Sequence, residues 1–195
     1  CAAEKKQYKY TYSGYCVLDD DFDPSQFGGA PALNSLKVTA AHEFFHASQF
    51  ATDVSEDRWF MESTATWMEE RFADDVDDNR QYLPAGQIGR PQISLDKFAS
   101  ADLMQYGNWL WWEYLTTRHG NGLVKSVWNK AGAFKGAPDQ YSTQALVSVL
   151  KSKGGFKRAV GAYASGNPLP AETYPEGAAY TPAPVTAYTL ESTDK

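Results

Sequence analysis

The chain has 195 residues, of which 43% are hydrophobic and 14% aromatic, and its formal net charge is −6. This length suits one ordinary domain and is short for two, and the composition excludes a disordered or low-complexity protein. Nucleic acid is not an expected partner, because an acidic surface repels phosphate backbones. No membrane span is expected either, since the longest apolar runs fall far below the ~20 residues that cross a bilayer. The sequence leaves the oligomeric state open.

The two cysteines, Cys1 and Cys16, flank a tyrosine-rich stretch typical of β-structure, which predicts a short strand or hairpin over residues 1–18. The pair is alone in the chain, and neither cysteine is expected near the metal motif described below. We therefore predict a Cys1–Cys16 disulfide, with two unpaired thiols as the alternative. Such a disulfide indicates an oxidising compartment and hence a secreted, extracellular protein.

The remaining pattern predicts a mostly helical α+β fold with its strand content near the N-terminus. Helical spacing of apolar residues covers 35–50, 59–72, 101–118, 123–131 and 156–164, and Ser142 is expected to cap one more helix. The acidic stretch 74–92 reads as a loop. We assign residues 1–166 to one domain, and the Pro/Thr/Tyr-rich residues 167–195 to an extended tail or linker.

A metal-binding pattern lies inside the first predicted helix, where His42, Glu43 and His46 form the sequence HExxH. Residues i and i+4 lie one turn apart on one helix face, so both imidazoles can reach a single zinc ion at ~2.0–2.1 Å. Glu43 is rotated by about 100° from His42, which leaves its carboxylate free to hold and activate a zinc-bound water. The alternative is a pair of amphipathic-helix histidines beside an ordinary salt link.

A catalytic zinc site needs a third protein ligand and one open position. The extended motif of the metzincins would require Gly and His where this chain has Gln49 and Thr52, which excludes that class. The remaining histidine, His119, precedes Gly120 at a helix end and is better explained as a capping or surface residue.

Glu62 is the predicted third zinc ligand. It lies in the apolar-to-small run 59–70, where a carboxylate is normally avoided unless it is paired or metal-bound. The alternative is an exposed acidic residue near a helix N-terminus. Thr66 follows one turn later on the same face, where its hydroxyl is expected to hydrogen-bond a ligand imidazole, and Glu69 continues that face.

The HExxH helix, followed by a helix with Glu62 in a Glu-Ser-Thr-Ala-Thr setting, resembles the gluzincin metallopeptidases of the peptidase MA clan. These include the thermolysin-like and aminopeptidase-N-type enzymes, and the pattern is most similar to uncharacterised secreted bacterial members. The resemblance implies a zincin-like catalytic domain that hydrolyses peptide bonds. The segment 106–115 resembles the aminopeptidase-type region whose tyrosine supports the oxyanion, which implies that role for Tyr106. A core tyrosine is the alternative.

The chain departs from that family in three respects. Only fifteen residues separate His46 from Glu62, Thr66 stands where thermolysin-like enzymes have a carboxylate, and the Gly-x-Met-Glu-Asn exopeptidase signature is absent. Aminopeptidase specificity therefore does not carry over, and an endopeptidase is the expected activity.

Two acidic clusters invite a comparison with calcium sites. They are Asp19, Asp21 and Asp23, and the stretch Asp74 to Asp78. Neither matches the EF-hand pattern, so a solvated acidic loop is the preferred interpretation for both.

Two functions other than catalysis are compatible with the sequence. The main rival is a non-catalytic zinc-containing module that binds peptide or glycan through the aromatic helix 106–115. An intact Glu43 argues against it, since a structural zinc site needs no general base. The tail alone suggests an adhesion or cell-wall scaffold.

Overall fold

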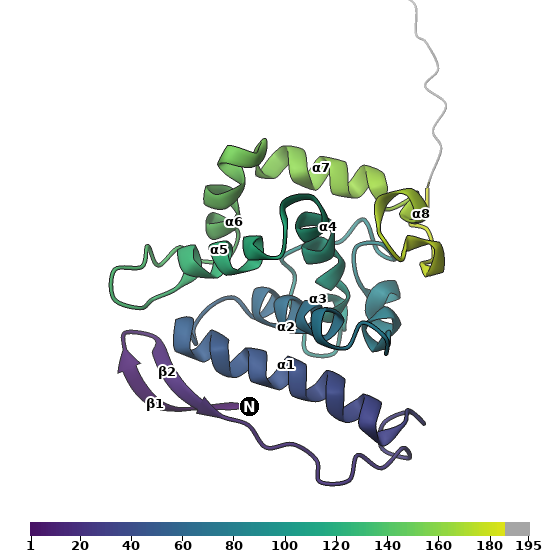
Figure 1. The fold of residues 1–195 in the computed structure, drawn as a ribbon. Coiled ribbons are helices and arrows are strands. Elements are labelled where there is room, and N and C mark those ends of the chain that lie inside the picture. Colours follow the sequence, from purple (N-terminus) through teal and green to yellow (C-terminus); the bar gives the residue numbers. More distant parts are fainter. Residues whose placement is uncertain (186–195) are drawn as a thin grey trace, which may run out of the picture.

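A computed structural model describes residues 1–185 and confirms the mainly helical α+β fold, with a two-stranded antiparallel sheet and eight α-helices in that range (Figure 1). The elements are β1 (Ala2–Tyr8), β2 (Thr11–Tyr15), α1 (Ala32–Thr52), α2 (Arg58–Phe72), α3 (Met104–Gly107), α4 (Trp109–His119), α5 (Gly122–Ala131), α6 (Thr143–Leu150), α7 (Phe156–Gly166) and α8 (Pro170–Thr173). Short 3-10 helices cover Asp78–Ala85, Lys151–Lys153 and Gly177–Ala179.

The N-terminal hairpin lies along α1, on the side away from α2 (Figure 1). Its strands pair from Ala2 opposite Tyr15 to Tyr8 opposite Thr11, and a disulfide between Cys1 and Cys16 closes its open end, as predicted. Gly14 permits the close approach of β2 to α1, because a Cβ at this position would lie 2.9 Å from the ring of Phe50.

The core is built around α2 and α4 from large aromatic rings. Phe60 of α2 packs edge-on against Trp112 and Trp128, with ring centroids 5.1 and 4.7 Å apart. Such pairs contribute about 0.5–1.5 kcal/mol each beyond the area they bury. Trp109, Trp111 and Trp112 are all fully buried. These tryptophans therefore form the interior and offer no surface to peptide or glycan, contrary to the rival interpretation of this helix.

The predicted helix 101–118 is in fact two helices, α3 and α4, which meet at Asn108. The buried Asn108 side chain accepts a hydrogen bond from the backbone of Gln87 and donates one to the carbonyl of Leu95. Gly107 also lies directly against the backbone of Gly86, where no Cβ would fit. These contacts with a distant loop interrupt the helix, and they set the direction of α3, which carries Tyr106.

Part of the predicted tail is folded. Residues 170–173 form α8, and the rings of Tyr174 and Tyr180 are buried in the aromatic core, only 4% and 5% exposed. The expectation of an extended tail is therefore wrong for 167–180, and residues 186–195 lie outside the described range. Within residues 1–185, none of the helices has the length and apolar character needed to cross a bilayer.

Candidate metal centre

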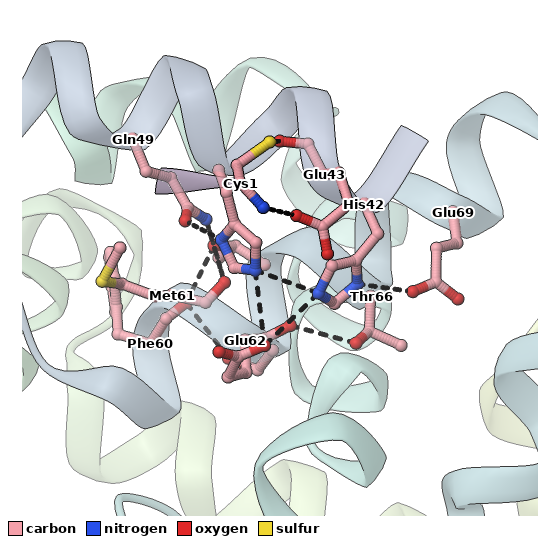
Figure 2. A network of polar contacts seen from close by, with 12 residues as sticks. Cys1, His42, Glu43, Gln49, Phe60, Met61, Glu62, Thr66 and Glu69 are labelled. Carbon is pink, nitrogen blue, oxygen red and sulfur yellow. Dashed lines mark hydrogen bonds and ion pairs between the residues drawn. The ribbon is translucent and has the colours of Figure 1, made fainter. Parts of the chain in front are cut away.

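Helices α1 and α2 bring the side chains of His42, His46 and Glu62 to one point. Figure 2 shows His42 and Glu62 facing each other there. The two Nε2 atoms lie 3.0 Å apart, and Glu62 Oε2 lies 3.3 Å from that of His42 and 3.4 Å from that of His46. Four ligands arranged tetrahedrally about zinc at ~2.0–2.1 Å are separated by about 3.3 Å from one another. Two imidazole nitrogens and one carboxylate oxygen also form a donor set that suits zinc. The three residues could thus hold one metal ion, and the spacing of their donor atoms is compatible with zinc.

Hydrogen bonds on the far side of each imidazole hold the two rings in place. His42 Nδ1 lies 2.6 Å from Glu69 Oε1, and His46 Nδ1 lies 2.6 Å from Gln49 Oε1. When Nδ1 carries the proton and donates it to these acceptors, Nε2 keeps its lone pair for a metal. Both rings are therefore held in the orientation that a zinc site requires.

Gln49 also ties the two ligand helices together. Its amide nitrogen donates to the carbonyl of Met61 at 2.9 Å and to the hydroxyl of Thr64 at 3.0 Å, both on α2. The side chain is only 1% exposed, so these bonds form away from competing water. One residue thus aligns His46 and holds α1 against the helix that carries Glu62.

The sequence reasoning anticipated a hydrogen-bonding partner for a ligand imidazole but assigned it to Thr66. The Thr66 hydroxyl instead donates to the backbone carbonyl of Glu62 at 3.0 Å, within α2. Glu69, on the same face, is the residue that reaches His42. In the sequence, Gln49 stands where the metzincin motif has glycine, and its i+3 spacing from His46 on one helix face is the signal that points to this contact.

The three donor residues line a cavity of about 820 Å³. Glu43 and Tyr106 line it, together with Phe50, Phe98, Tyr141, the loop residues 54–57 and Arg58 at the start of α2. The disulfide lies at its edge, with the sulfurs of Cys1 and Cys16 2.8 and 3.4 Å from the carbonyl oxygen of Glu43. The backbone nitrogen of Cys1 also contacts the Glu43 carboxylate (Figure 2). The sequence expectation that both cysteines lie away from the metal site is therefore wrong.

Tyr106 lies across the cavity from α1, with its ring 6.0 Å from that of His42 and 5.3 Å from that of Tyr82. Burial, together with the nearby carboxylates of Glu62 and Glu43, raises the pKa of Tyr106 to about 12. The phenol therefore keeps its proton at neutral pH and remains a hydrogen-bond donor.

Charge on the metal-free site is shared between the imidazoles and Glu62. Burial lowers the pKa of His42, but hydrogen bonds to Glu62 and Glu69 outweigh it and bring that pKa to about 9. The pKa of Glu62 shifts in the opposite direction. Burial raises it, but the hydrogen bonds to His42 and His46 lower it by more and bring it to about 2. Metal-free His42 is thus protonated at neutral pH, and a zinc ion must displace that proton.

We therefore expect zinc affinity to rise with pH, by about tenfold per unit between pH 6 and 8. An ordinary histidine, with a pKa of 6.5, would let the affinity level off near pH 7, whereas a pKa of about 9 extends the slope to pH 8. Competition with a chromophoric chelator at pH 6, 7 and 8 measures the slope. Calorimetry in two buffers of different ionisation enthalpy counts the protons released, and an affinity that does not change with pH would contradict the expectation.

We also expect Gln49→Leu to weaken zinc binding by about 10- to 100-fold, because His46 loses the acceptor that orients it. Thr64→Val is the matched control, since it removes one partner of Gln49 but leaves the Gln49–His46 hydrogen bond in place. Chelator competition on both folded variants measures the effect. Equal zinc affinity in Gln49→Leu and the wild type would show that Gln49 does not position His46.

Two further acidic groups have the spacing of a metal site in residues 1–185. Asp19, Asp20 and Asp21 form one, and Glu70, Asp74 and Glu176 form the other. The first is fully exposed, and the Asp19 carboxylate accepts hydrogen bonds from the backbone of Asp21 and Phe22. His119 lies at the end of α4 and belongs to none of these groups.

Comparison with known proteins identifies the family. A family model described as "Family of unknown function (DUF6055)" matches residues 28–150, which is more than half of the chain, and the chain belongs to this family. The matched region contains His42, Glu43, His46, Glu62 and Tyr106. No curated protein and no solved structure matches the chain.

Proposed function

We propose that this protein is a zinc metallopeptidase of the gluzincin type. The observation that carries the proposal is the triangle of donor atoms on His42, His46 and Glu62, with edges of 3.0–3.4 Å that match a tetrahedral zinc site. Glu43 and Tyr106 line the same cavity as the three donors. A purely structural zinc site is usually closed by a fourth protein ligand, and no fourth histidine, cysteine or carboxylate joins this group in residues 1–185.

Each residue has a distinct part in the proposed reaction. When bound, zinc supplies Lewis acidity that polarises the scissile carbonyl and acidifies a water molecule. Glu43 takes the proton of the attacking water and passes it to the leaving amine as the C–N bond breaks. Tyr106 donates its phenolic hydrogen bond to the oxyanion of the tetrahedral intermediate, a contribution of about 3 kcal/mol in sites of this kind.

The proposed substrate is a peptide or protein, cleaved internally. A cavity of about 820 Å³ lies within the usual size range of ligand sites. The absence of the exopeptidase signature from the sequence favours an endopeptidase over an aminopeptidase. The Cys1–Cys16 disulfide favours an oxidising compartment, which supports a secreted protein.

Mass-spectrometric cleavage of a mixed peptide library tests this function. The zinc-loaded protein is compared with the same protein after chelation and again after zinc is restored. We expect internal cuts that disappear on chelation and return with zinc, and the residues flanking them would define the specificity. A folded, zinc-loaded protein that cuts no peptide and yet binds peptide or glycan would favour the non-catalytic module.

A further inference from the structure

Three carboxylates from distant parts of the chain meet at the end of α2. Glu70 lies in the last turn of that helix, Asp74 follows it, and Glu176 comes from the C-terminal segment between α8 and the last 3-10 helix. One oxygen of each lies within 4.8 Å of the others. Calcium binds oxygen at 2.3–2.6 Å, so ligands on its opposite sides are up to about 5 Å apart. The spacing therefore suits a calcium ion.

The side chain of Asn79 independently indicates that a cation binds at this carboxylate cluster. Asn79 is only 2% exposed, and its amide nitrogen donates to Glu70 Oε2 at 2.6 Å, so the amide group is directed into the cluster. Its amide oxygen is buried and has no hydrogen-bond partner. A buried acceptor without a partner costs about 1–3 kcal/mol. An amide oxygen is also a common calcium ligand, so a cation would satisfy it.

The protein's own cations do not neutralise the cluster. Arg80 pairs with Glu176 at 2.7 Å and with Asp77 at 2.8 Å. Arg71 similarly divides its charge between Glu70 and Glu113, each at 3.2 Å. Two guanidinium groups thus serve four carboxylates, and Asp74 has no ion pair within residues 1–185. A divalent cation would offset the remaining negative charge.

We infer that Glu70, Asp74, Glu176 and the amide oxygen of Asn79 form a calcium site that fastens the C-terminal segment to α2. The site links residues about one hundred positions apart, next to the buried rings of Tyr174 and Tyr180. Calcium fits better than magnesium, because carboxylates on a helix, a loop and a distant segment form the flexible, all-oxygen set that calcium accepts. The inference is independent of the proposed peptidase activity.

The exposed group Asp19, Asp20 and Asp21 has no buried, unpartnered polar atom comparable to the amide oxygen of Asn79. The carboxylates of Asp19, Asp21 and Asp23 accept hydrogen bonds from backbone amides of their own loop, and none of these side chains is buried. We make no proposal for that loop.

Calcium titration of the zinc-loaded chain tests the site. Calorimetry and thermal unfolding, with calcium raised to ~10 mM, are expected to show one binding event and a rise in Tm. Hydrogen exchange of residues 170–183 should slow when calcium binds, because Glu176 becomes tied to α2. None of these readouts depends on peptide cleavage.

Two neighbouring variants provide a matched comparison. Asp74→Asn removes one charged ligand at an exposed position and is expected to weaken calcium binding by at least about tenfold. Asp75→Asn removes the same charge one residue later, where the carboxylate contacts Lys37 instead, and is expected to leave calcium affinity within about twofold of wild type. The inference is overturned if the wild-type chain binds no calcium in this range, or if both variants bind it as tightly as wild type.

Discussion

Replacing Glu43 by glutamine is expected to abolish peptide hydrolysis while zinc binding is retained. Glutamine has nearly the same shape as glutamate but cannot accept the proton of the attacking water. A positioned general base contributes about 10²- to 10⁴-fold to a rate, and a loss of this size brings turnover to background. Zinc should remain, because the three converging donor atoms belong to His42, His46 and Glu62. Turnover of a cleaved library peptide and zinc content by elemental analysis measure both quantities.

The control for this variant is Glu172→Gln, the same chemical change at an exposed position on α8, far along the chain from the cavity. It should retain wild-type turnover and zinc content. Full activity in Glu43→Gln would show that another group takes the proton, and the role proposed for Glu43 would be wrong. Loss of zinc together with activity would instead place Glu43 among the metal ligands.

The parts of the candidate site that follow from the sequence depend on local geometry. His42, Glu43 and His46 share one helix, and the 3.6-residue period alone brings the two imidazoles together. Glu62 was inferred from the cost of placing a carboxylate in an apolar run, and the structure brings it within 3.4 Å of both rings. In both cases the decisive information lies within a few residues of the site.

The parts that the sequence did not predict depend on contacts between distant segments. Asn108 breaks the long aromatic helix only because its side chain binds the loop residues Gln87 and Leu95. Tyr174 and Tyr180 lie in a Pro-rich stretch without helical periodicity, so their burial against α4 leaves no local pattern. Contacts of this kind follow from the tertiary fold, which overrides local propensity.

The hydrogen-bonding partners of the two imidazoles could be predicted only in part. Helical spacing correctly placed Glu69 on the face of Glu62, but it could not decide between Thr66 and Glu69. That choice depends on the distance between α1 and α2, which the buried Gln49 bridge helps to set. The short side chain of Thr66 bonds within α2, whereas the longer side chain of Glu69 reaches His42 on α1.

Replacing Glu62 by alanine is expected to weaken zinc binding strongly. Zinc sites with several protein ligands have apparent binding free energies of about 10–16 kcal/mol at neutral pH, or roughly 3–4 kcal/mol per ligand. Loss of one ligand therefore weakens the affinity by about 10²- to 10³-fold. Glu62→Gln is the companion variant, because it fills the same space and separates the loss of charge from the loss of packing. Chelator competition and the rise in Tm on zinc addition measure the effect.

The comparison with Glu43→Gln makes this test decisive. Both residues line the same cavity and both changes remove one carboxylate, yet only Glu62 belongs to the group of converging donor atoms, with Oε2 within 3.4 Å of both Nε2 atoms. We expect Glu43→Gln to keep stoichiometric zinc and to unfold at a higher temperature when zinc is added. Both Glu62 variants should need about 10²- to 10³-fold more zinc for the same rise in Tm. Stoichiometric, tight zinc in Glu62→Ala would move the third ligand elsewhere. Because the gluzincin proposal requires a downstream glutamate ligand, that result would also remove its main support.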